Sequence, residues 1–97
     1  MKYNVSLESV GTISLEGTNM TLRELDSVVL TEDLPEYGLK CGDLGTIVLV
    51  HRDGTGYEVE FVTLTGETIA VVSLSPSQLR PIASREIAHA RPVNTTA

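Results

Sequence analysis

Several classes of protein need residues that this 97-residue chain has few of. Cys41 is its only cysteine, which excludes an intrachain disulfide and a cysteine-rich metal site and favours a reducing compartment. The longest apolar runs, residues 47–50 and 69–72, are much shorter than the roughly 20 residues that cross a membrane. The first residues also contain no apolar core of a secretion signal. We therefore expect a cytoplasmic protein.

Basic residues are scarce as well, with 7 Lys and Arg against 13 Asp and Glu and a net charge of −6. Sequence-independent attraction to a phosphate backbone depends on Lys and Arg, so nucleic acid is a disfavoured partner. Hydrophobic residues still make up 41% of the chain, which is ordinary for a folded protein. At this length the chain has room for a single small domain.

The sequence predicts β-strands and almost no helix. Residues 57–61 alternate between apolar and acidic side chains, and the Asp-Gly pair at 53–54 and the Thr-Gly pair at 65–66 are typical of hairpin turns. The Ser-Pro-Ser-Gln segment at 75–78 predicts one short helical turn before the last strand. The five predicted strands cover residues 26–30, 45–51, 57–61, 68–74 and 79–82. We expect an all-β fold, a small five-stranded SH3-like barrel, with an open meander as the alternative.

The chain divides into three parts by composition. Residues 22–82 hold most of the β-branched residues and turn signals and are predicted to form the barrel domain. Residues 1–21 are rich in Ser, Thr and Gly and predict an N-terminal arm or weak hairpin, whereas residues 83–97 predict a polar C-terminal tail. The side chains expected inside the barrel are Val28, Leu30, Val48, Val50, Val59, Phe61, Val72 and Leu74.

Three motifs carry a resemblance to a known family. They are L-D-x-V-V-L-T-x-D-L-P at 25–35, G-D-x-G-T-[IV]-V at 42–48 and Y-E-V-E-F at 57–61. Through them the chain resembles, over residues 22–82, a family of small bacterial proteins described only as a domain of unknown function. The resemblance implies a small β-barrel-like domain and no known activity. Members often lie beside genes for small toxin-like proteins, which is an indirect indication of function.

Residues 42–48 also resemble the KOW motif of ribosomal and transcription-factor barrels, in which neighbouring basic residues contact RNA. Around this segment the charges have the opposite sign, because residues 22–44 contain six acids and two bases. A nucleic-acid-binding barrel of KOW type is therefore kept as the alternative function. A turn that starts a barrel strand explains the glycines more simply.

An acidic run in the long turn at 31–43 is the strongest candidate for a binding surface. Its carboxylates lack the alternating spacing of a calcium loop, but they would attract a basic partner, with Tyr37 as an aromatic anchor. Leu49 falls on the outer side of a predicted strand, where an apolar side chain needs a neighbour from outside the core. The predicted partner-binding residues are Glu32, Asp33, Glu36, Tyr37, Leu39 and Leu49. A solvated loop is the simpler alternative.

Residues able to carry catalysis are few and far apart. His51 and His89 do not have the spacing of metal ligands, and the thiol of Cys41 has only Lys40 beside it. We predict no catalytic residue, no metal and no cofactor, and therefore no enzyme. The expected function is a small acidic interaction module, in the manner of an antitoxin or immunity protein, which binds a basic protein or a second copy of itself.

Overall fold

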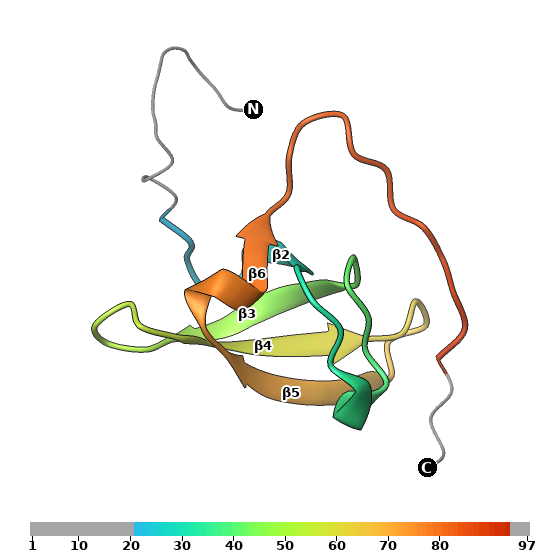
Figure 1. Ribbon diagram of the computed structural model, residues 1–97, viewed down its shortest axis with the longest axis horizontal. Coiled ribbons are helices and arrows are strands. Elements are labelled where there is room, and N and C mark those ends of the chain that lie inside the picture. The colour runs from blue at the N-terminus through green and yellow to red at the C-terminus, as the bar shows by residue number, and fades with distance from the viewer. Residues whose placement is uncertain (1–20, 94–97) are drawn as a thin grey trace.

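The computed structural model describes residues 21–93, whose strands form one antiparallel sheet (Figure 1). The elements are β2 (Ser27–Leu30), η3 (Pro35–Tyr37), β3 (Leu44–Val50), β4 (Tyr57–Val62), β5 (Thr68–Leu74), η4 (Pro76–Gln78) and β6 (Leu79–Pro81), where η marks a short 3-10 turn. The order across the sheet is β5-β4-β3-β2-β6. The predicted all-β fold, with five strands and a helical turn before the last of them, is confirmed.

Tight turns explain why β3, β4 and β5 pair with their neighbours in the chain. Gly54 and Gly66, in the two hairpin turns, have φ of 73° and 97°, which glycine adopts without the clash that a Cβ would cause. In η4 the Ser75 N–H donates to the side-chain oxygen of Gln78 at 2.9 Å, and Pro76 begins the turn. This turn redirects the chain, so that β6 pairs with β2.

The sheet is bent, but it does not close into a barrel. Figure 1 shows β2 and β6 crossing steeply over the layer of β3, β4 and β5. Strands β5 and β6 are at opposite ends of the strand order and do not pair with each other. Because β6 is only three residues long and Pro81 has no N–H to donate, β6 offers little to a further strand. The sheet therefore remains unclosed between β5 and β6.

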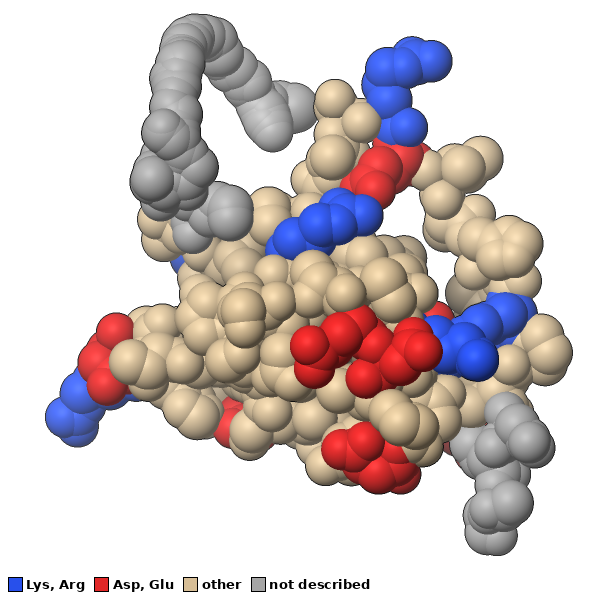
Figure 2. All heavy atoms as spheres, viewed as in Figure 1, with Lys and Arg blue, Asp and Glu red and all other residues tan. Residues whose placement is uncertain are grey.

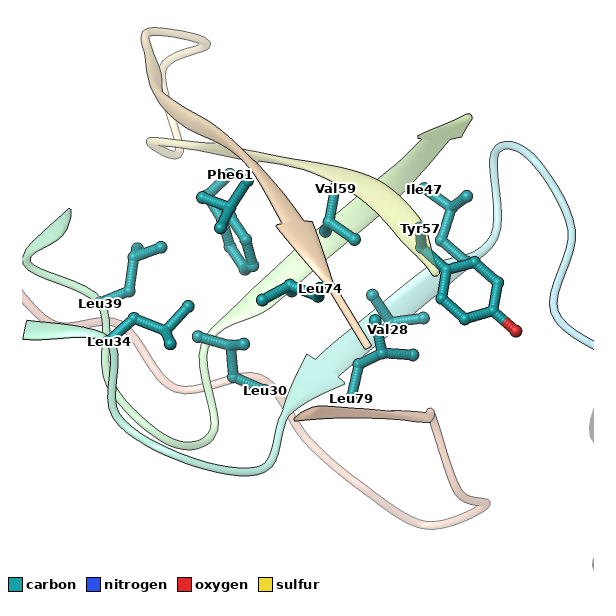
Figure 3. Close-up of a cluster of buried hydrophobic side chains, with 11 residues drawn as sticks. Val28, Leu30, Leu34, Leu39, Ile47, Tyr57, Val59, Phe61, Leu74 and Leu79 are labelled. Atoms are coloured by element: carbon teal, nitrogen blue, oxygen red, sulfur yellow. The ribbon is translucent and has the colours of Figure 1, made fainter. Parts of the chain in front are cut away.

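The hydrophobic core lies inside the bend of the sheet, with side chains from all five strands and from the loop after β2 (Figure 3). A fully or nearly buried position is shared by Val28, Leu30, Leu34, Leu39, Ile47, Tyr57, Val59, Phe61, Val72, Leu74 and Leu79. The predicted core residues of β2, β4 and β5 are confirmed. Buried residues alternate with more exposed ones in β4 and in the second half of β5, whereas all three apolar residues of β2 are buried.

The exception is β3, where the prediction that Val48 faces inward is wrong. The register of β3 against β4 shifts between Ile47 and Leu49, which marks a β-bulge. Ile47 is fully buried, whereas Val48 is 40% exposed and Val50 is only partly buried. Strict alternation from Val50 would place Val48 on the inner face. The bulge adds one residue to β3, so Ile47 faces inward instead of Val48.

The chain on either side of the sheet is described only in part. The predicted N-terminal arm at 1–21 lies outside the described residues, except for Thr21. After β6, residues 82–93 contain no strand or helix. They arch away from the sheet and return beside the loop between β2 and β3 (Figure 1). The C-terminal segment is thus in contact with the region that the sequence marked as a binding surface.

Candidate partner-binding surface

The loop between β2 and β3, residues 31–43, is long but firmly attached to the domain. Leu34 and Leu39 face each other across a bridge with two backbone hydrogen bonds of 2.9 and 3.1 Å, and both side chains are buried in the core. The Gly42 N–H donates to the carbonyl oxygen of the last residue of β2 at 2.8 Å, which closes the loop at its base. The loop tip, η3, therefore projects from two buried leucines.

Two of the predicted acidic residues take part in hydrogen bonds that hold the loop. A Glu32 oxygen accepts from the side-chain amide of Gln78 at 2.8 Å, and Asp33 Oδ1 accepts from the Cys41 N–H at 2.8 Å. The first bond joins the start of the loop to η4, and the second joins it to the other end of the same loop. Both side chains are exposed, so their charges still act on an approaching partner.

The loop tip carries the groups that are free to bind. Within residues 21–93 the carboxylate of Glu36 and the hydroxyl of Tyr37 have no hydrogen-bond or ion-pair partner, and Tyr37 is 42% exposed. Figure 2 shows acidic side chains gathered on the face that carries this loop. A partner that binds here would meet a carboxylate and an aromatic ring on backbone that is already held in place, which lowers the ordering cost of binding.

The structure corrects the role of Leu39 and separates Leu49 from the loop. Leu39 is 3% exposed because it packs into the core beside Leu34, so its side chain cannot reach a partner. Leu49 is 49% exposed and pairs with Glu58 on β4. Along the extended strand it lies about 16 Å from Leu44, the first residue after the loop. The loop thus brings together Glu32, Asp33, Glu36 and Tyr37, and Leu49 is apart from them.

A contact that sequence reasoning missed joins the C-terminal segment to the end of the loop. Arg91 Nε donates to Asp43 Oδ1 at 2.9 Å, and Arg91 Nη2 donates both to Asp43 Oδ2 and, at 3.0 Å, to the carbonyl oxygen of Gly38. Burial by itself raises the pKa of the Asp43 carboxyl, but the bonds from Arg91 and from the Lys40 N–H, together with both positive charges, lower it overall. No local pattern marks this pair, because its members are 48 residues apart.

A second polar cluster spans the outer side of the sheet. Glu58 Oε2 accepts the Ser73 hydroxyl at 2.6 Å and lies 2.8 Å from His51 Nε2, and these two bonds lower the pKa of Glu58. The carboxylate stands between the hydroxyl and the imidazole. The imidazole contacts the carboxylate and not the hydroxyl, so this order of groups differs from that of a Ser-His-Asp triad, in which the imidazole is beside the serine.

The described residues contain neither a metal-binding cluster nor a membrane-spanning helix. Over residues 21–93, no three side chains of His, Cys, Asp and Glu are grouped so that they could hold a metal ion. In the same part of the chain, none of the helical turns has the length and apolar character needed to cross a membrane.

The described residues define a small all-β domain with a partly open five-stranded sheet and an acidic loop. Residues 24–81 match the model of DUF4926, a domain of unknown function, and the chain belongs to this family. The match runs from just before β2 to the last residue of β6 and leaves Arg91 outside. No curated protein and no solved structure matches the chain.

Proposed function

We propose that the protein is a small acidic interaction module whose loop tip binds a basic surface of another protein. The observation that carries the proposal is the loop at 31–43. Two buried leucines anchor it, whereas Glu36 and Tyr37 at its tip have no partner within the described residues. The net charge of −6 adds a long-range attraction for a positively charged surface.

The residues of the loop would have different effects on binding. Glu36, with the nearby charges of Glu32 and Asp33, would speed association and make it sensitive to salt. Tyr37 would bury its ring against the partner and slow dissociation, since aromatic anchors carry much of the energy of interfaces. The two kinds of contribution are separable by measuring rates.

The kind of partner that we propose follows from charge and size. An acidic antitoxin or immunity protein would cover a basic surface, such as the cleft of a nuclease, and this domain has a suitable charge. We propose that it acts in this way in a bacterial cytoplasm. The exposed free thiol of Cys41 supports a reducing compartment.

Affinity capture with matched variants tests the proposal. Wild type, Glu36→Lys, Tyr37→Ala and Glu24→Lys are immobilised and exposed to a lysate of a bacterium that encodes the chain. Glu24→Lys is the control because it makes the same charge change elsewhere: Leu25, next to it, donates to the Ile47 carbonyl near the middle of β3.

We expect wild type and the control to retain a basic protein that both loop-tip variants retain poorly. Equal retention by all four proteins, or no protein retained by wild type, would contradict the proposal.

A further inference from the structure

The contact between Arg91 and the loop has the geometry of an arginine-binding site. The guanidinium presents Nε and Nη2 side by side to the two carboxylate oxygens of Asp43, a bidentate pairing that lysine cannot make. The third bond, to the Gly38 carbonyl at 3.0 Å, fixes the plane of the guanidinium. The Arg91 and Asp43 side chains are 24% and 20% exposed, so the pair is largely shielded from water.

The receptor groups of this contact, the Asp43 carboxylate and the Gly38 carbonyl, are held in place by bonds that do not involve Arg91. Asp43 Oδ2 accepts the Lys40 N–H at 2.8 Å, and the Lys40 carbonyl accepts the Asp43 N–H at 2.9 Å, so the backbone of the loop orients the carboxylate. Gly38 has a left-handed φ of 72° and donates its N–H to Pro35 at 3.1 Å, which sets the direction of its own carbonyl. Both receptor groups lie within residues 24–81, the part that matches the family.

Arg91, which occupies the site, lies outside the residues that match the family, on a segment with few contacts to the rest of the domain. The start of the C-terminal segment is held by Glu86, which pairs with Arg80 at 2.7 Å and accepts the Ala83 N–H at 2.7 Å. Residues 87–90 are exposed, and the structure gives them no hydrogen bond to the rest of the described chain. Arg91 therefore holds the far end of the segment through its side chain, and an arginine supplied from outside could replace it.

We infer that Asp43 and the Gly38 carbonyl form a binding site for an arginine side chain of another protein, and that Arg91 occupies this site in the free chain as an internal substitute. The inference rests on the proposed function and gives its basic partner a specific chemistry. Displacement of Arg91 would accompany partner binding and would free the C-terminal segment from the loop.

A groove of about 400 Å³ beside the guanidinium leaves room for the residues that flank a bound arginine. It is lined by Asp33, Pro35, Gly38, Leu39, Lys40, Arg91 and Pro92. Asp33 and Lys40 both line this groove, and their opposite charges leave recognition to the bidentate pairing of the guanidinium with Asp43. We therefore expect the site to select arginine over lysine.

Peptide binding to the full chain tests the inference. The probe has the chain's own sequence at 88–94, Ala-His-Ala-Arg-Pro-Val-Asn, and a matched peptide has Lys in place of Arg. The backbone amide NMR shifts of Gly38, Lys40 and Asp43 report on the site. Arg91→Ala should bind the Arg peptide at millimolar concentration, at least about tenfold more tightly than wild type, because Arg91 leaves few wild-type sites open.

Two further variants keep the result independent of folding defects. Arg91→Lys keeps the charge but loses the bidentate fork, so it should also bind the Arg peptide more tightly than wild type does. Asp43→Asn combined with Arg91→Ala should lose the response while the amide spectrum of the sheet remains that of a folded protein.

Four outcomes would overturn the inference: no response in Arg91→Ala, equal affinity of Arg91→Ala and wild type, equal binding of the Arg and Lys peptides, or a wild-type dimer that Arg91→Ala abolishes. The last would show that a second copy of the chain is the occupant. None of these measurements involves Glu36 or Tyr37, so a failure here is distinguishable from a failure of the loop-tip proposal.

Discussion

Alanine substitutions at Ile47 and Val48, made one at a time, test the bulge that sets the faces of β3. The two residues are adjacent, but Ile47 is fully buried and Val48 is 40% exposed. At about 0.8 kcal/mol per buried methylene, Ile47→Ala removes about 2.4 kcal/mol of transfer free energy, and the cavity raises the expected loss to about 3–4 kcal/mol. Val48→Ala removes a smaller group that is already partly in water, so the expected loss is about 1 kcal/mol or less.

Urea denaturation measures both losses as changes in the free energy of unfolding. Wild type and the two variants should have similar m-values, so that the midpoints can be compared directly. Ile47→Ala should lower the midpoint several times more than Val48→Ala does. Equal losses, or a larger loss for Val48→Ala, would refute the position of the bulge and support strict alternation along β3.

Three further predictions concern the sheet, an ion pair and nucleic acid. Gly45→Ala should cost about 1–3 kcal/mol by urea denaturation, since a Cβ would lie 2.5 Å from Val59 and 2.8 Å from Phe61; a loss below about 0.5 kcal/mol would contradict this close packing. Hydrogen bonds, chiefly from Arg80, lower the pKa of Glu86 from 4.5 to about 2, so the contribution of this pair to stability is complete above pH 4.5 and is lost as the pH falls toward 2. An NMR titration of the Glu86 carboxyl with a midpoint near 4.5 would be incompatible with the ion pair. RNA and duplex DNA should bind no more tightly than about 10⁻⁶ M at physiological salt, and submicromolar binding in an anisotropy titration would disprove this.

Short-range chemistry made most of the sheet predictable. Strand β5 has the bounds that were predicted, 68–74, and β4 extends only one residue beyond the predicted 57–61. The hairpin turns and η4 also lie where the glycines and the Ser-Pro pair predicted them. These elements depend on the conformations of a few adjacent residues, and those preferences are visible in the sequence.

The features that were not predictable depend on residues far apart in the chain. The bulge at Ile47 is a property of the register between β3 and β4, and closure depends on how much pairing the short β6 can offer. Leu39 looked available to a partner until its bridge with Leu34 placed it in the core. Neither register nor burial of this kind can be obtained from the pattern of one segment.

The candidate site was likewise predictable in its short-range features and not in its long-range contacts. The acidity of the loop and the presence of an aromatic residue at 37 were evident from composition. Which carboxylates are already engaged was not, because the bond from Gln78 to Glu32 spans 46 residues and the pair of Arg91 with Asp43 spans 48. The C-terminal segment has no periodic sequence pattern, so its contact with the loop could not be predicted from the sequence.

Binding kinetics with the captured partner test the central proposal most directly. Association and dissociation rate constants are measured over a range of salt concentrations for wild type, Glu36→Lys, Tyr37→Ala and the control Glu24→Lys. If the loop tip binds a basic surface, Glu36→Lys slows association, reduces its salt dependence and changes dissociation little, whereas Tyr37→Ala speeds dissociation. Association rates of Glu36→Lys that equal those of Glu24→Lys, with a dissociation rate of Tyr37→Ala that equals wild type, would contradict it.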